Sequence, residues 1–468
     1  AISVGDSFSC AVLSNGSVTC WGGNDLGQLG DGTNTNSTAP GSMVQLSQDA
    51  VTVSSGQSHS CAILQDGKVA CWGNNDYGQL GDGTLIDKNS PAIAQLPSSK
   101  SAVMIDVGIS HTCAIMNDGT LYCWGLNANH QLADGTNAFK SVPVQSSLPN
   151  GISATLVTAG EGHTCILTNE STIYCIGANS EGQLGESTTV SRTTFTETKW
   201  NQNNSISSLY YTLGYATENK LSFTGWGDEY NVTSTPLPAG LTLDSEKGTL
   251  IYNGMTTITD TITIFVTSGN VNFSKNITIQ VFEHNQIEGR IDSYSYDSGF
   301  GTFSQKPISV RMGYHHGCLI DYDHKMKCWG YNGHGEIGIS YTGSQYTYPT
   351  NINHGYMTSS RDMDVGTYQV CSIDNESKLW CWGYNPYGNL GVGDATVRNT
   401  PSQVKDITNT LQVSVGQYLA CALDSSWDVY CWGYNNQGQA GESSLSNQLR
   451  PNLISGLGDS RPTMVSAG

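Results

Sequence analysis

Short apolar runs alternate along the chain with turns that contain glycine, asparagine or aspartate. The clearest example is Cys61–Cys71, where two half-apolar runs flank Asp66-Gly67, a dipeptide typical of tight hairpin turns. Asn15-Gly16 occupies the same place in an earlier segment. This pattern predicts antiparallel strands joined by short turns, and therefore an all-β fold.

Fourteen cysteines form seven pairs, each pair ten positions apart and each spanning one such hairpin. The pairs are Cys10 and Cys20, Cys61 and Cys71, Cys113 and Cys123, Cys165 and Cys175, Cys318 and Cys328, Cys371 and Cys381, and Cys421 and Cys431. An even spacing around a tight turn places two cysteines opposite each other on adjacent strands, within reach of a disulfide. Zinc cysteines come in closer pairs, so the spacing favours disulfides over a metal site. Disulfides at this density persist outside the reducing cytosol, which predicts a secreted or cell-surface protein.

The hairpins belong to a repeat of about 52 residues, a period that indicates propeller blades or solenoid turns. Successive first cysteines are separated by 51, 52, 52, 153, 53 and 50 residues. Each unit opens with an apolar strand that ends in glycine five positions before its first cysteine. The second cysteine is followed by Trp-Gly in six of the seven units and then by a turn like Gly27-Gln28-Leu29-Gly30.

These units resemble the regulator of chromosome condensation repeat family. The match is close from His111-Thr112-Cys113-Ala114-Ile115 through Trp124-Gly125, and it extends over roughly residues 1–190 and 305–468. The resemblance implies a seven-bladed β-propeller with four-stranded blades. Within the family, a nuclear member is a nucleotide exchange factor that contacts chromatin, whereas secreted bacterial relatives include a β-lactamase inhibitor protein that binds through one propeller face. The paired cysteines and the net acidity place this chain nearer the secreted kind.

The long fourth interval exceeds one period by about 101 residues, the size of a small domain. Its segment Pro236–Asp244, followed by Gly248-Thr249-Leu250, resembles the immunoglobulin-like, cadherin-related domains of surface proteins, although Tyr252-Asn253-Gly254 departs from their usual pattern. We therefore expect propeller blades one to four in residues 1–198, an immunoglobulin-like β-sandwich in 199–303, and blades five to seven in 304–468.

The last residues, Met464–Gly468, repeat the strand that opens every unit, yet Ala1–Gly5 already opens the first unit. Three explanations stay open. The chain continues beyond residue 468, the extra strand closes the ring, or it pairs with a neighbouring subunit by strand addition.

Composition narrows the possible partners. The 468 residues include 54 glycines and 13 prolines, and 20 basic residues face 39 acidic ones for a net charge of -19. Nucleic acid is an unsuitable partner for such a chain, because binding phosphates requires a basic surface. No apolar run approaches the length of a membrane helix. Eight sequons could carry N-glycans; their asparagines are Asn15, Asn36, Asn169, Asn203, Asn231, Asn272, Asn276 and Asn375.

The tryptophan after the second cysteine is expected to pack between blades, because propellers bury one aromatic residue in each repeat. His59, His111, His163 and His316 also fall near their first cysteines and are interpreted as strand packing. Tyr331, Tyr384 and Tyr434 follow Trp-Gly only in the last three units. If they emerge on one face, they form an aromatic patch that anchors protein or glycan partners; the alternative is packing between blades.

The sequence contains no Gly-x-Ser-x-Gly, Walker or His-Glu-x-x-His motif, and we predict neither an enzyme nor a bound metal or cofactor. Acidic residues after the Gly-Gln-Leu-Gly turn, such as Asp82 and Glu186, are expected to cap turns rather than to bind calcium. We expect a secreted or surface protein that acts in adhesion or in the assembly of an extracellular structure. The alternatives are a soluble inhibitor or regulator that binds another protein through one face and, third, an extracellular enzyme with a site built from loops.

Overall fold

The computed structural model describes residues 2–199, 307–343, 345–352, 357 and 359–457 and, between them, residues 208–212, 217–220, 231–234, 236–237, 241–244, 249–252, 258–268 and 271–282. The chain divides into two compact units. The first comprises Ala1–Trp200, Pro307–Ile320 and His324–Gly468, and the second comprises Asn201–Lys306 with Asp321–Asp323. Within the described part of the chain, no helix has the length and apolar character needed to cross a bilayer.

The first unit contains seven antiparallel sheets, which we number as blades in chain order. Blades 1 to 4 comprise β1 (Ile2–Val4), β2 (Phe8–Val12) and β3 (Val18–Gly22); β4 (Ala50–Ser55), β5 (His59–Leu64), β6 (Val69–Gly73) and β7 (Lys88–Ile93); β8 (Ala102–Val107), β9 (His111–Met116), β10 (Leu121–Gly125) and β11 (Lys140–Gln145); and β12 (Ala154–Ala159), β13 (His163–Thr168), β14 (Ile173–Gly177) and β15 (Arg192–Glu197). Blades 5 to 7 comprise β23 (Pro307–Met312), β24 (His316–Asp321), β25 (Met326–Gly330) and β26 (Tyr346–Asn351); β27 (Asp362–Val365), β28 (Gln369–Ile373), β29 (Leu379–Gly383) and β30 (Arg398–Gln403); and β31 (Thr410–Val415), β32 (Leu419–Asp424), β33 (Val429–Gly433) and β34 (Gln448–Leu453).

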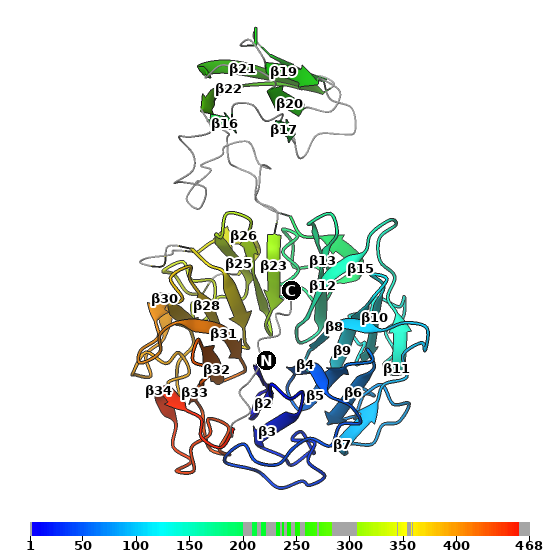
Figure 1. Cartoon of the computed structure of the whole chain (residues 1–468). Coiled ribbons are helices and arrows are strands. Elements are labelled where there is room, and N and C mark those ends of the chain that lie inside the picture. The colour runs from blue at the N-terminus through cyan, green and yellow to red at the C-terminus, as the bar shows by residue number, and fades with distance from the viewer. Residues whose placement is uncertain are drawn as a thin grey trace. The chain divides into compact units, whose positions relative to one another are not determined.

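The blades form a ring, so the predicted seven-bladed β-propeller is confirmed (Figure 1). Their first strands contact one another in the cyclic order β1, β4, β8, β12, β23, β27, β31 and back to β1. The blade that ends the described chain therefore lies beside the blade that begins it. Blade 1 has three regular strands, and the isolated bridges Thr19–Met43 and Gly22–Ser37 stand where its fourth strand would run.

All fourteen cysteines are disulfide-bonded, in the seven predicted pairs. The bonds join Cys10 to Cys20, Cys61 to Cys71, Cys113 to Cys123, Cys165 to Cys175, Cys318 to Cys328, Cys371 to Cys381 and Cys421 to Cys431. In each blade the two cysteines are register partners on the second and third strands, as Cys113 and Cys123 are on β9 and β10. Their Cα atoms lie 4.1 Å apart, and both side chains are fully buried. Each bridge thus joins the two central strands of one blade, and none joins two blades.

Packing between blades explains why tryptophan recurs at one place in the repeat. Six tryptophans are fully buried, and each indole Nε1 donates to a backbone carbonyl of the preceding blade. The bonds run from Trp21 to Gln439, Trp72 to Gln28, Trp124 to Gln79, Trp329 to Gln183, Trp382 to Glu336 and Trp432 to Asn389, with lengths of 2.7–3.1 Å. The bond from Trp21 to Gln439 crosses from blade 1 to blade 7. Blade 4 carries the buried Ile176 instead and lacks this bond.

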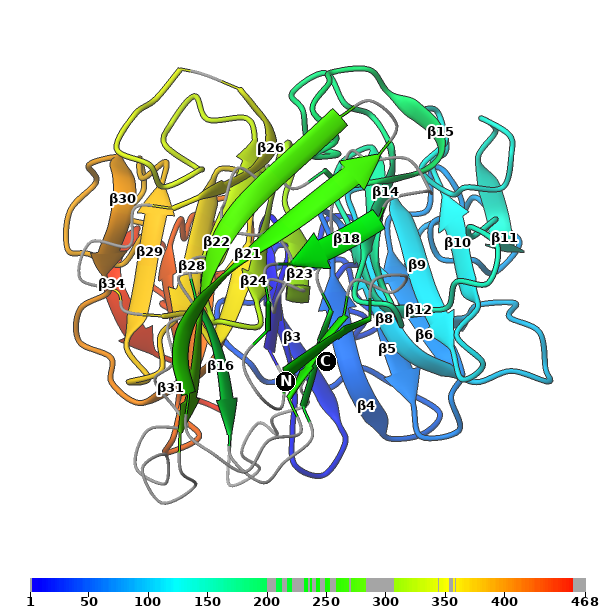
Figure 2. The ribbon, with the colours of Figure 1, turned by 90° about the horizontal axis from the view of Figure 1, so that it is seen from above.

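The described residues of the second unit form two sheets. The larger has the order β16-β22-β21-β18 and the smaller the order β17-β20-β19. Their strands are β16 (Ser208–Thr212), β17 (Thr217–Lys220), β18 (Asn231–Ser234), β19 (Leu241–Asp244), β20 (Thr249–Tyr252), β21 (Ile258–Ser268) and β22 (Val271–Phe282). β21 and β22 form a long antiparallel pair beside β18, whereas β16 joins β22 in parallel (Figure 2). The predicted extra strand Met464–Gly468 and the sequon at Asn203 lie outside the described residues.

Candidate binding face

The antiparallel order of each blade gives the propeller two distinct faces. The disulfide hairpins between second and third strands lie at one end of every blade, which we call the hairpin face. The turns between first and second strands, and the loops between third and fourth strands, lie at the other end, which we call the loop face. Positions that recur at the same place in each repeat therefore meet on the same face of the ring.

An aromatic cluster covers the loop face of blades 5 to 7. It consists of nine half-buried side chains in mutual contact: Tyr314, His315, Tyr331, His334, Tyr368, Tyr384, Tyr387, Tyr418 and Tyr434. Its inner row comprises Tyr314, Tyr368 and Tyr418, one from the first turn of each blade. Neighbouring rings of this row are nearly parallel, with centroids 6.5 and 6.0 Å apart and interplanar angles of 26° and 25°.

The outer row of the cluster comes from the loops that follow the third strands. His334 stacks on Tyr384 with ring centroids 4.2 Å apart, and Tyr387 lies 4.6 Å from Tyr434. The two rows meet where Tyr368 lies 5.9 Å from His334 and Tyr387 lies 5.0 Å from Tyr418. The rings thus form one continuous layer across three blades, and each retains part of its surface in solvent.

In the outer row, a buried asparagine follows Tyr331, Tyr384 and Tyr434 and fixes the loop that carries each of them. In blade 6 the side chain of Asn385 accepts the backbone N–H of Leu390 at 2.9 Å and donates to the carbonyls of Asp394 and Thr396 at 2.9 and 3.0 Å. Asn332 and Asn435 bind their loops in the same way. Because Asn385 is fully buried and fully bonded, the adjacent Tyr384 projects from a rigid support.

The structure brings the three predicted tyrosines Tyr331, Tyr384 and Tyr434 into this single cluster. Tyr331 packs against His315 and His334 of its own blade. Tyr384 and Tyr434 each also contact a ring of the preceding blade. The inner row was not predicted. Its tyrosines follow the strand-ending glycine by one residue in blade 5 and by two residues in blades 6 and 7. Only a comparison of whole turns, which allows for this shift of one residue, identifies all three, because the first three blades have no aromatic residue there.

Carboxylates adjoin the inner row. The side chain of Gln57 opposes the rise in pKa of both Asp6 and Tyr314. Burial raises the pKa of Asp6 to about 6. Burial and the charges of Asp6 and Glu161 raise the pKa of Tyr314. Glu161 also lies 3.2 Å from His315, measured between Oε2 and Nδ1.

Lysine and arginine are absent from the inner part of the loop face. This part consists of two sets of positions in every blade. The first set is the strand-ending glycine with the two residues after it, and the second is the four residues that follow the third strand. Together they contain five carboxylates and no lysine or arginine. The carboxylates belong to Asp6, Asp25, Asp76, Glu161 and Glu181. All of these positions are described by the structure.

The acidic residues after the Gly-Gln-Leu-Gly turn cap their loops, as expected. Asp134 accepts hydrogen bonds from the backbone and the hydroxyl of Thr136, each 2.9 Å long, and pairs with Lys140 at 3.0 Å. Glu186 pairs with Arg192 at 2.6 Å. Within the described residues, no three histidine, cysteine or acidic side chains gather as a metal site.

The first strands of the blades surround a central cavity of about 610 Å³. One side chain per blade links its first strand to the next blade. It stands two positions before the strand-ending glycine, and in six of the seven blades it accepts a backbone N–H from the next blade. Asp106 accepts from Ala159 at 2.7 Å, and Asp364 accepts from Val415 at 2.6 Å. Arg311 stands at this position in blade 5. Burial raises the pKa of Asp364 to about 6, and the charge of Arg311 opposes this rise. These carboxylates hold neighbouring strands together.

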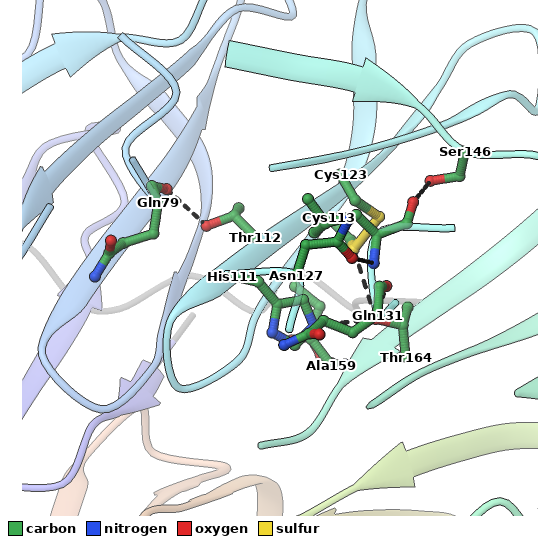
Figure 3. The surroundings of a disulfide bond; sticks show 12 residues. Gln79, His111, Thr112, Cys113, Cys123, Asn127, Gln131, Ser146, Ala159 and Thr164 are labelled. Carbon is green, nitrogen blue, oxygen red and sulfur yellow. Dashed lines mark hydrogen bonds between the residues drawn. A yellow bond between two sulfur atoms is a disulfide. The ribbon is translucent and has the colours of Figure 1, made fainter. Parts of the chain in front are cut away.

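The repeated histidines pack between strands, as predicted. His111 is fully buried, and its Nε2 lies 3.0 Å from the Thr164 hydroxyl of the next blade, close to the disulfide of Cys113 and Cys123 (Figure 3). His59 makes the equivalent contact with Thr112 at 3.0 Å. Burial lowers the pKa of His111 to about 4. Through this contact, a neutral imidazole stabilises the packing of one blade against the next.

The repeats match a known family over more than half of the chain. One model of the regulator of chromosome condensation (RCC1) repeat matches residues 15–63, 66–115, 118–167, 376–423 and 428–468, and another model of this repeat matches residues 1–28, 50–79, 104–131, 154–183, 308–336 and 411–439. The chain belongs to the RCC1 repeat family.

RCC1 repeats relate this chain to proteins of several functions. The ultraviolet-B receptor UVR8 of Arabidopsis thaliana is 24% identical over 409 residues, which span 87% of this chain and 82% of that protein. The probable E3 ubiquitin-protein ligase HERC6 of Homo sapiens is 34% identical over 198 residues, but these span only 40% of this chain and 19% of that protein.

Solved structures of RCC1 proteins share the fold. The structure of yeast RCC1 (Prp20) bound to Kap60 matches with a TM-score of 0.63 and 15% identity, over 97% of this chain and 85% of that one. Human WBSCR16 matches with a TM-score of 0.65 and 14% identity, over 98% and 96%. At these identities the likeness shows the propeller alone.

Proposed function

We propose that this protein is a secreted or cell-surface binding protein without catalytic activity, which contacts its partner through the aromatic cluster and serves in adhesion or in the assembly of an extracellular structure. The observation that carries the proposal is the continuous layer of nine half-buried aromatic rings on the loop face. Tyrosine anchors interfaces well, since it supplies a large rigid surface at little entropic cost.

The extracellular location is supported by the seven disulfides, because disulfides at this density are typical of oxidising compartments. The sequons add support, because Asn15, Asn169 and Asn375 are exposed in the hairpin turns of blades 1, 4 and 6. Glycans attached there would project from the hairpin face. Asn36 is exposed in the loop after the third strand of blade 1, on the loop face, while Asn231, Asn272 and Asn276 lie on strands of the second unit.

For the second unit we propose an immunoglobulin-like β-sandwich over residues 199–303. Its four-stranded and three-stranded sheets supply the seven strands that such a domain requires. A domain of this kind would offer a second surface for contact with a neighbour in an assembly.

The absence of catalysis is supported by the setting of the titratable groups in the central cavity. Asp106 and Asp364 are engaged by backbone N–H groups of neighbouring blades, and the buried histidines described above pack between blades. A general base needs a free position beside its substrate.

The combined variant Tyr331→Ala, Tyr384→Ala and Tyr434→Ala tests the role of the aromatic cluster. Surface plasmon resonance against the native extracellular surface material should show at least tenfold weaker binding, while the midpoint of thermal unfolding changes little. A matched control combines Tyr322→Ala and Tyr341→Ala, which removes tyrosines that are 66% and 72% exposed outside the cluster. An equal loss of binding in the control, or unfolding of the triple variant, would contradict the proposal.

The second candidate is a soluble regulator that forms a one-to-one complex with another protein. Solved relatives support protein partners, because the structure of yeast RCC1 (Prp20) was solved bound to Kap60, and Prp20p from Saccharomyces cerevisiae has binding properties to Gsp1p and histones. Electron microscopy of the native material separates the two candidates. Filaments or lattices indicate assembly, whereas a discrete complex of two chains indicates regulation.

A further inference from the structure

We propose that the partner of the aromatic cluster is an extended polypeptide segment that presents arginine or lysine side chains at alternate positions. The inference rests on the proposed binding role of this face and adds the chemistry of the partner. It follows from three features of the described residues: the aromatic layer, the sign of the charges around it and the spacing of its inner row.

Aromatic rings and carboxylates attract the same kind of ligand. The faces of tyrosine rings carry negative electrostatic potential, and a guanidinium or ammonium group placed over them is stabilised. Asp6 and Glu161 adjoin the inner row, and Glu181 acts electrostatically on Tyr331. Since no lysine or arginine occurs in the inner turns and loops of this face, no permanently cationic side chain there competes for the rings or repels a cation.

A buried carboxyl adds to this potential from beneath the cluster. In blade 5 Glu336 replaces the glutamine found at this position in five other blades, and its side chain is fully buried. One oxygen accepts the backbone N–H of His334 at 2.8 Å, and the other has no hydrogen-bond partner. Its charge contributes to the raised pKa values of Tyr331 and Tyr368. A cation above these rings would offset a negative charge that the protein leaves uncompensated.

The inner row also has the spacing of an extended chain. Adjacent centroids from Tyr314 to Tyr368 to Tyr418 are 6.5 and 6.0 Å apart. Residues i and i+2 of a β-strand point to the same side and lie about 6.6 Å apart. Successive side chains on one side of an extended peptide would therefore meet successive tyrosines. Arginine suits these sites better than lysine, because its planar group stacks on aromatic faces.

Short synthetic peptides test the proposal on the intact protein by isothermal titration calorimetry at low ionic strength. The first peptide carries three arginines at alternate positions in a glycine–serine background. The second carries the same arginines three residues apart, and the third carries glutamates at the alternate positions. We expect the first peptide to bind about tenfold more tightly than the second, and the third not to bind. Added salt should weaken the binding.

Variants link the binding to the rings and charges. Tyr368→Ala should weaken the first peptide about tenfold, Tyr368→Phe should retain most of the affinity, and Glu161→Gln should weaken it without changing the fold. Tyr341→Ala, outside the cluster, is the matched control. Near-ultraviolet circular dichroism checks that each variant remains folded.

Three results would overturn the inference in distinguishable ways. If the glutamate peptide or a neutral oligosaccharide such as chitotetraose binds in a manner that depends on Tyr368, the face is a binding face but its partner is not cationic. If no peptide binds and the native surface material still depends on Tyr331, Tyr384 and Tyr434, the inference fails while the proposed function stands. If neither the peptides nor the native surface material bind in a manner that depends on these tyrosines, both the inference and the proposed function fail.

Discussion

At the scale of single residues, the buried asparagine beside each outer tyrosine decides how rigidly the cluster is presented. Asn385 satisfies one N–H and two carbonyls that would otherwise be left unpaired in the interior of the loop. An alanine at this position cannot replace those bonds. The loop would then have to open to water or bury polar groups without partners.

Asn385→Ala should lower the free energy of unfolding by about 2–4 kcal/mol, as expected when several buried polar groups lose their partner. Binding through the cluster should weaken as well, although every aromatic ring is still present, because Tyr384 loses its support. Urea unfolding and the binding assay measure the two effects. Asn436→Ala, at an exposed position in the next blade, should be nearly neutral. An equal effect of the two variants would show that the hydrogen bonds of the Asn385 side chain do not stabilise the loop.

Single residues also mark the limit of the sequence prediction. Tyr331, Tyr384 and Tyr434 share one position in the repeat, so a comparison of repeats found them. Tyr314 occupies a position one residue earlier in its turn than Tyr368 and Tyr418, and the match by position fails there. Only the three-dimensional ring shows that these turns bring the side chains together.

At the scale of strands and blades, the hydrophobic pattern, the cysteine spacing and the tryptophan position predicted the sheets, the disulfides and the packing between blades. Each of these signals is local or recurs at a fixed period, so a single sequence is enough to predict the features that depend on it. The replacement of the fourth strand of blade 1 by two isolated bridges was not predictable, because it depends on the path of a long loop over its neighbours. The sandwich proposed for the second unit likewise rests on a weaker match between motifs.

Trp382→Ile copies the natural residue of blade 4 into blade 6. The substitution removes a fully buried indole and leaves the Glu336 carbonyl without its 2.9 Å hydrogen bond. We expect the free energy of unfolding to fall by about 3 kcal/mol, as is usual for large-to-small changes in a packed core. Guanidinium unfolding measures the loss, and Ile176→Val, which should cost about 1 kcal/mol, serves as the comparison. A neutral Trp382→Ile would mean that the blades do not depend on this contact.

At the scale of the whole molecule, the acidity of the loop face makes cation binding depend on pH. Burial raises the pKa of Asp6 to about 6 and of Glu336 to about 7, so both carboxyls lose negative charge as the pH falls from 7.5 to 5. His334, whose pKa burial lowers, and the pair of Glu161 and His315 adjoin the same rings. The loss of the two carboxylate charges disfavours a cation.

The affinity for the alternate-arginine peptide should therefore fall about tenfold between pH 7.5 and pH 5. Calorimetry at several pH values measures the change, and Asp6→Asn should reduce both the affinity at pH 7.5 and the dependence on pH. A flat profile would show that these groups do not act on the bound cation.

The confinement of every disulfide to a single hairpin has a consequence for the covalent connectivity of the ring. A proteolytic cut inside a hairpin, such as the one between Cys61 and Cys71, leaves the two parts joined through sulfur. A cut in a loop between two blades leaves them joined only by packing and hydrogen bonds. Under denaturing, non-reducing electrophoresis the first product would migrate as one chain and the second as two fragments, so the ring depends on its folded state, and not on its cross-links, to remain whole.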